Sequence, residues 1–165
     1  MSEGSPTVDR PRMPAGYGLA ADAAGRLEWG PVAARLAEAR NYWVVTSGPD
    51  GAPHAMPVWG LWLDGAVLFS TGRGTRKGRN LAADPRVVVH LESGDDVVVV
   101  RGGAAEVRDP SALGRFADAY ERKYGIRPAA EPDPDAPVFA VRPRVVLGWR
   151  ERDFPTSATR WRFPG

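Results

Sequence analysis

The strongest constraint on the fold of this chain is a pair of apolar, β-prone runs on either side of Asp64-Gly65. Residues 53–63 form the first run and residues 66–71 the second, and both are rich in the residue types that strands prefer. Asp-Gly suits the positive φ angles of a two-residue turn. We therefore predict a tight antiparallel hairpin, around which the remaining strands must assemble.

The second run leads directly into a basic, glycine-rich segment. Two hydroxyls, Ser70 and Thr71, come first, and the segment ends in Asn80 and a short helical pattern. Free backbone N–H groups and the helix dipole favour an anion at a helix start, so the pattern predicts a phosphate cradle. The alternative is an ordinary solvated helix start with surface arginines. Four cations lie among three glycines here: Arg73, Arg76, Lys77 and Arg79.

Short β-prone runs outnumber helical patterns along the chain, and hairpin-length links favour an antiparallel architecture. Such strands close most simply into a small barrel. Pro57 predicts an edge or a bulge, and Gly102-Gly103 predicts a bend inside a strand. We predict helices at residues 28–40, at about 109–124, and before Asp84-Pro85, with a loop at 131–137. Further strands are expected at residues 42–46, 86–92, 97–107, 138–141 and 145–149, the last two separated by Pro143.

Composition narrows the class of protein. The length of 165 residues suits one domain, here residues 27–165, preceded by a segment (1–26) that we expect to be mobile or laid over the surface. No cysteine is present, which excludes disulfides and thiolate chemistry. The sequence shows neither a long apolar run nor a signal-like start, so we expect a cytoplasmic protein without a membrane partner. Acids interleave with the cations almost everywhere, which argues against nucleic-acid binding.

The two histidines do not suggest a metal site, because no cluster of acids accompanies either of them. His54 is a weak candidate for a proton donor or a substrate contact, and a structural role is the alternative. For His90 we expect a core or interface position. Alternation along residues 53–63 predicts that one of Trp59 and Trp62 faces the core and the other a cleft or an interface.

The order of these patterns resembles the pyridoxamine 5′-phosphate oxidase-like family of split-barrel flavoproteins. The similarity covers roughly residues 43–149 and is closest to the actinobacterial branch of flavin and deazaflavin oxidoreductases. Its most specific part is Lys-x-x-Asn-x-x-x-Asp-Pro-Arg, which runs from Lys77 to Arg86. The resemblance implies a mainly β, antiparallel split β-barrel of the FMN-binding type.

The resemblance also implies a homodimer that holds its cofactor in a cleft between subunits. Trp149 and Arg160 occupy places comparable to flavin and substrate contacts of the vitamin-forming oxidases, but the closing residues differ, so vitamin oxidation is not expected. The cofactor ring would lie on Met56, Pro57, Val58 and Trp59, with Ser70 and Thr71 at its border, and Thr75, Arg76, Lys77 and Asn80 would hold the phosphate.

The expected activity is hydride transfer between coenzyme F-420, or FMN as second choice, and a small organic substrate. The absence of a nucleophile with an adjacent base is consistent with this, because the cofactor carries the difficult chemistry. Arg73 and Arg79 would suit the anionic tail of the deazaflavin. The alternative is a non-catalytic flavin-, deazaflavin- or haem-binding protein of the same fold.

Overall fold

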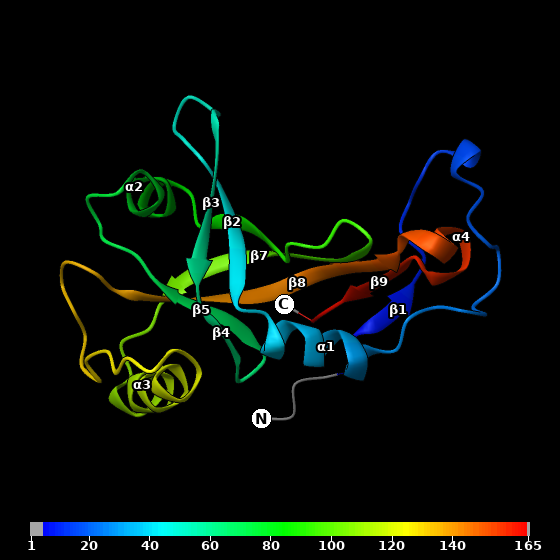
Figure 1. Ribbon diagram of the computed structural model, residues 1–165. Helices are drawn as coiled ribbons and strands as arrows, with labels where there is room; N and C mark the ends of the chain where they lie inside the picture. The colour runs from blue at the N-terminus through cyan, green and yellow to red at the C-terminus, as the bar shows by residue number, and fades with distance from the viewer. Residues whose placement is uncertain (1–4, 165) are drawn as a thin grey trace.

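The computed structural model describes residues 5–164, and over this range nine strands form one antiparallel sheet (Figure 1). The strand order is β1-β9-β8-β7-β6-β2-β3, while β5 pairs with β8 and with β4. The antiparallel, mainly β expectation is confirmed. The strands are β1 (Thr7–Asp9), β2 (Asn41–Ser47), β3 (Pro53–Trp59), β4 (Leu61–Leu63), β5 (Ala66–Ser70), β6 (Arg86–His90), β7 (Asp96–Glu106), β8 (Val138–Arg150) and β9 (Thr159–Arg162).

Helices cover the ends and the open side of the sheet. The α2 and α3 helices lie at one end of the long β8, and α4, β9 and β1 lie at the other (Figure 1). The carboxylate of Asp109 accepts a hydrogen bond from the Ala112 N–H, which begins α3 where the sequence predicted it. No helix within residues 5–164 is long and apolar enough to cross a membrane. The helices are α1 (Trp29–Glu38), α2 (Arg76–Ala83), α3 (Pro110–Tyr124) and α4 (Phe154–Ser157), with 3-10 turns η1 (Ala15–Tyr17) and η2 (Glu151–Asp153).

The predicted hairpin is confirmed as the pair β4 and β5. Leu63 lies opposite Ala66, and the two residues between them have φ angles of 51° for Asp64 and 72° for Gly65. Both values lie in the left-handed region, which Asp and Gly adopt more readily than most residues.

The prediction of one strand over residues 53–63 is wrong, because the chain turns at Gly60. The strand before this residue, β3, pairs with β2, and the strand after it, β4, pairs with β5. A Cβ at Gly60 would lie 2.7 Å from the Leu68 carbonyl oxygen and 3.2 Å from Tyr42 Cδ2. The close approach of these strands therefore requires glycine, and β3, which carries Pro57, becomes an edge strand as predicted.

The predicted interruption at Pro143 is also wrong, since residues 138–150 form one strand. The pairing of β7 with β8 instead shifts register at the expected bend: Arg101 lies opposite Val145, and Gly102 lies opposite Pro143. One extra residue, Arg144, is thereby accommodated as a β-bulge. Beyond β7, the first part of β8 pairs with β5 and its last part with β9, so the sheet divides at the bulge.

The larger hydrophobic cluster lies inside the curved sheet and the smaller one under α3. In the first, Val44, Phe69 and Val100 have no exposed surface. In the second, Leu113 and Phe116 of α3 pack against the hairpin. These two clusters fix the hairpin between the barrel and α3, and so place the segment that follows it.

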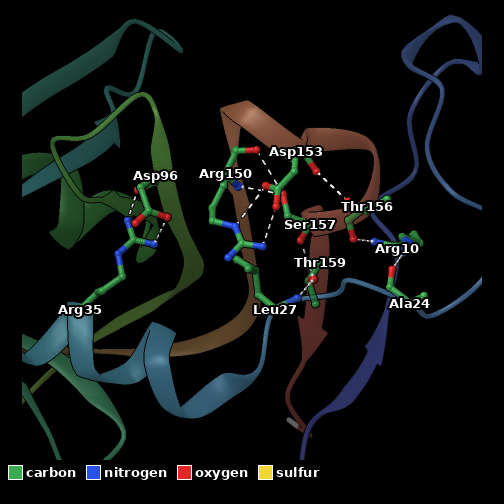
Figure 2. Close-up of polar contacts among 10 residues, drawn as sticks. All are labelled: Arg10, Ala24, Leu27, Arg35, Asp96, Arg150, Asp153, Thr156, Ser157 and Thr159. Atoms are coloured by element: carbon green, nitrogen blue, oxygen red, sulfur yellow. Dashed lines mark hydrogen bonds and ion pairs between the residues drawn. The ribbon is translucent and has the colours of Figure 1, made fainter.

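The described part of the N-terminal segment lies against the C-terminal strands (Figure 2). Arg10 donates hydrogen bonds to the carbonyl oxygens of Thr156, Ala158 and Ala24. Farther along, the Leu27 N–H donates to Thr159 Oγ1 over 2.8 Å. Residues 1–4 lie outside the described range, and the division between a mobile segment and a domain stays a prediction.

Candidate cofactor site

The basic segment after β5 folds into a compact loop and the first turn of α2. Thr75 is the N-cap: its Oγ1 accepts from the Gly78 N–H at 3.0 Å and donates to the Gly72 carbonyl at 2.8 Å. Thr71 Oγ1 lies 3.1 Å from the same hydroxyl. Thr75 thus satisfies one of the free N–H groups that every helix start presents, and others remain for a ligand.

Gly78 lets the helix approach this loop closely. A Cβ at this position would collide with the Gly72 carbonyl oxygen and with the backbone of Arg73. The glycine-rich composition therefore has a local structural reason, which is contact between loop and helix. The hydroxyls of Thr71 and Thr75 and the N–H groups of the first turn are brought together, whereas Arg73 reaches Glu106 instead.

Lys77 is the unusual residue of this turn. Lys77 is only 8% exposed, and no described residue forms a hydrogen bond or ion pair with its side chain. Burial lowers the pKa of its amine. The amine itself reaches solvent, since no fully buried side-chain nitrogen or oxygen in the described range lacks a hydrogen-bond partner. Partial burial still disfavours its charged form, so an anion delivered to this position would stabilise the ammonium.

A cleft of about 380 Å³ opens beside the helix start. Asn80 in its wall is 3% exposed, and its Nδ2 donates to Thr46 Oγ1 at 3.0 Å, which ties α2 to β2. The exposed Arg79 donates to the Gly74 carbonyl oxygen. Residues lining the cleft are Pro49, Asp50, Arg76, Arg79 and Asn80.

The β3 edge presents a second surface. Met56 is 47% exposed and Trp59 is 38% exposed. Trp59 stacks on Tyr124 with ring centroids 4.8 Å apart and planes 5° apart, and the Arg40 guanidinium lies 5.2 Å from its ring. Trp62 instead contacts Trp29 edge-on and packs against the larger core. The prediction that one tryptophan faces the core and the other does not is confirmed.

The family model described as pyridoxamine 5′-phosphate oxidase matches residues 31–150, which include the hairpin, α2 and the central strands. The chain belongs to the pyridoxamine 5′-phosphate oxidase-like family. Its sheet has the split-barrel fold of that family, as the sequence predicted. Family members include flavin- and F-420-dependent oxidoreductases as well as non-catalytic binders, and they often form dimers that bind small molecules.

Several solved structures are similar to the chain. A conserved hypothetical protein, Rv2991 from Mycobacterium tuberculosis, is 25% identical with a TM-score of 0.66, over 81% of this chain and 90% of that one. An F420 reductase is 28% identical with a TM-score of 0.52, over 67% and 92% of the two chains. A heme-binding protein from Mycobacterium smegmatis, 23% identical with a TM-score of 0.56 over 70% and 52%, shares the fold. A search of curated protein sequences finds no match.

Two of the residues expected to border the cofactor in this family contact the loop before β8. Ser70 Oγ donates to the Ala136 carbonyl at 2.9 Å, and the Thr71 N–H donates to the Pro137 carbonyl at 3.3 Å. Arg73 forms a 2.9 Å ion pair with Glu106, and this hydrogen bonding lowers the pKa of Glu106. Arg73 is therefore engaged within the protein, unlike Lys77.

The histidines differ in their surroundings. His54, half-buried on β3, lies opposite Thr46, the residue that holds Asn80. His90 lies parallel to Trp43 with ring centroids 6.1 Å apart and planes 1° apart. Of the residues compared with the vitamin-forming oxidases, Arg160 forms a 2.7 Å ion pair with Asp9, and Trp149 contacts Phe154 edge-on. Ligand roles for all of these residues stay predictions.

Lys123 lies on α3, next to the Tyr124 that stacks on Trp59, and sequence analysis did not identify it as a site residue. Its Nζ donates to the Gly60 carbonyl at 3.1 Å, to Tyr42 Oη at 3.2 Å and to the Ala37 carbonyl at 3.2 Å. Burial lowers the pKa of this amine to about 8. Only the composition could have drawn attention to this residue, because the chain has twenty arginines and only two lysines. In the structure, Lys77 is buried and Lys123 is half-buried.

Proposed function

We propose that the chain is an oxidoreductase that binds a flavin-type cofactor at the start of α2 and transfers a hydride to or from a small organic substrate. The observation that carries this proposal is Lys77, which is 8% exposed and has no hydrogen-bond or ion-pair partner among residues 5–164, beside a capped helix start. In a family whose members include flavin- and F-420-dependent oxidoreductases, a phosphate is the anion that such a turn suits best.

The chain's own residues bind and orient. Lys77 supplies a point charge and Arg76 a planar fork toward the phosphate, while Thr75 fixes the turn on which both stand. Asn80 holds the turn to the sheet through Thr46. The exposed edge at Met56 and Trp59 offers an apolar surface for a ring. When bound, the cofactor would supply the hydride chemistry.

Coenzyme F-420 is our first choice and FMN our second. Likeness to an F420 reductase at 28% identity supports the deazaflavin. The charge argument is weaker than the sequence indicated, because Arg73 is paired with Glu106 and Arg79 bonds the Gly74 carbonyl. We also propose a homodimer, since the β3 edge is exposed and family members often dimerise.

A non-catalytic binder is the second candidate, favoured by the same lack of a nucleophile and base that suits a hydride-transfer enzyme. The two functions differ in turnover. A binder would hold cofactor without oxidising its reduced form in the presence of any acceptor, whereas an enzyme would bleach it reproducibly with some enones or quinones.

The decisive experiment is a paired fluorescence titration of the purified protein with FMN and with F-420. Tight binding of F-420 alone would support the first choice, and tight binding of FMN alone would support the second. An acceptor screen with the bound cofactor then separates enzyme from binder. If neither cofactor binds, the proposed function is wrong.

A further inference from the structure

A second groove, separate from the α2 cleft, opens on the outer face of the sheet. Its volume is about 470 Å³, and it shares no lining residue with the cleft described above. Three arginines line it, Arg86, Arg101 and Arg144, against one acid, Asp84. Nothing in the proposed cofactor site uses these arginines.

The sheet itself creates this groove. Arg101 lies opposite Val88, and Arg86 lies opposite Gly103 on the same outer face. The β-bulge inserts Arg144 between Pro143 and Val145, and bulges commonly redirect a side chain in this way. Gly102 and Gly103 contribute no side chain, so no side chain from these two positions fills the space between the arginines.

The charges of the groove are only partly neutralised. Asp84 is bound by Arg86 at 2.6 Å, and hydrogen bonding from Arg86 lowers the pKa of this carboxyl to about 2, so it stays ionised. Arg101 and Arg144, both exposed, form no side-chain hydrogen bond or ion pair with any residue in the described range 5–164.

The arginines of the cleft beside α1 behave differently. In the cleft beside α1, Arg35 is paired with Asp96 at 2.7 Å and Arg150 with Asp153 at 2.6 Å (Figure 2). Both of these arginines are therefore neutralised by acidic side chains of the protein itself. In the groove at the bulge, Arg101 and Arg144 are not. Its walls also contain the half-buried valines Val45 and Val88 and the hydroxyl of Ser47.

We propose that this groove binds a small organic molecule with two or more anionic groups. Arg101 and Arg144 would each grip a carboxylate or phosphate group through a planar fork, and the apolar body would cover Val45 and Val88. The proposal does not rest on the proposed cofactor, because none of its residues belongs to the α2 turn.

The test uses isothermal titration calorimetry of the full chain with benzene-1,3,5-tricarboxylate, an aromatic probe carrying three anionic groups. Relative to the unchanged protein, R101Q/R144Q should weaken binding about tenfold or more, because two charge-assisted contacts are lost. Two controls should bind within about twofold of the unchanged protein. Arg122→Gln removes an exposed arginine from the last turn of α3, and Lys77→Ala removes the cation of the α2 turn.

Inorganic pyrophosphate and phenyl phosphate complete the comparison. Pyrophosphate should bind about tenfold more weakly than the tricarboxylate, because it has no apolar body to cover the valines. Competition by phenyl phosphate would show that the groove accepts a phosphate group beside an apolar body, which supports the proposal. Equal binding of pyrophosphate and the tricarboxylate would overturn the organic ligand.

Two further outcomes would overturn the site itself: no binding by the unchanged protein, or a loss in Lys77→Ala that equals the loss in R101Q/R144Q. If the double variant fails to fold, the unchanged protein is modified with phenylglyoxal with and without the tricarboxylate. Protection of Arg101 and Arg144 in peptide mass spectra would support the proposal, and protection confined to other arginines would refute it.

Discussion

Lys77 and Lys123 show how differently one residue type can be used within a small domain. Both are withdrawn from the surface, and burial lowers the pKa of each amine. Lys123 directs its amine at two backbone carbonyls and the Tyr42 hydroxyl, whereas Lys77 has no partner among the described residues. The first arrangement connects α3 to α1, to β2 and to the turn at Gly60. The second leaves an amine that we propose to bind an external anion.

Lys77→Ala should weaken cofactor binding at least about tenfold, because one charge-assisted contact to a phosphate is lost. The apo protein should keep its melting temperature, since the Lys77 amine reaches solvent and forms no hydrogen bond or ion pair with a described residue that the substitution would remove. Fluorescence titration and thermal melting measure the two effects, and Arg122→Ala serves as the matched loss of one surface cation. Unchanged affinity would contradict the phosphate role of Lys77.

Lys123 should give the protein a distinctive pH dependence of stability. Its pKa is about 8 in the folded state against an ordinary 10.5, so between these values the unfolded chain binds more protons. The free energy of unfolding should therefore rise as pH increases from about 8 toward 10.5, whereas below about pH 8 both states carry the proton and this contribution should be constant. Urea denaturation across this window should show that rise in the unchanged protein but not in Lys123→Met. Identical slopes for the two proteins would contradict the assignment.

The buried pair of Asn80 and Thr46 should behave as one unit. Removing either partner alone leaves the other without its hydrogen bond, which costs about 1–3 kcal/mol. Asn80→Ala and Thr46→Val should each destabilise the fold, and the double variant should cost less than the sum by about 0.5 kcal/mol or more. Additive losses in urea denaturation would mean that the 3.0 Å contact does not couple the two residues.

At the scale of elements, the sequence predicted correctly the turns and helix starts that depend on neighbouring residues. The turn at Asp64-Gly65 and the Asp109 cap of α3 depend on neighbouring residues, and both were predicted correctly. The break at Gly60 and the continuity through Pro143 depend on partner strands distant in sequence, so the same reading failed there. Strands β1 and β9 were missed because each is short: β1 is ordered by pairing with β9, and β9 pairs with both β1 and β8.

In the candidate site too, features set by neighbouring residues were predicted and contacts with distant residues were not. The sequence placed Thr75 and Lys77 at a helix start, because caps and glycines act within a few residues. It did not indicate that Arg73 would be taken by Glu106, 33 residues away, or that Tyr124 would stack on Trp59. Both contacts depend on how α3 and β7 pack, which no short pattern encodes.

The turn between β3 and β4 should tolerate no side chain. Gly60→Ala would press a methyl group against the Leu68 carbonyl at 2.7 Å, and overpacking of this kind costs about 1–3 kcal/mol. Gly114→Ala is the matched control, because a Cβ there meets no atom within 4 Å and alanine favours the helix by about 0.5–1 kcal/mol. Chemical denaturation should shift in opposite directions for the two variants. A neutral Gly60→Ala would contradict the close approach.

At the scale of the whole molecule, the β3 edge should associate with a second copy. Analytical ultracentrifugation should then give twice the monomer mass of 17.8 kDa. Met56→Asp, which places a charge on the 47% exposed edge, should weaken association. Tyr17→Asp changes a 55% exposed aromatic on the distant η1 turn and should leave it unchanged. A monomer at micromolar concentration would refute the proposed homodimer.

The position of β8 in the sheet has a consequence for how the chain acquires its structure on the ribosome. β5, at residues 66–70, is synthesised long before residues 138–141 of β8, the segment that pairs with its other edge. During that interval one edge of a strongly apolar strand is unpaired, which is a site for association with other chains. Nascent chains halted between α3 and β8 should therefore recruit chaperones or aggregate, and release from this state should coincide with the emergence of β8.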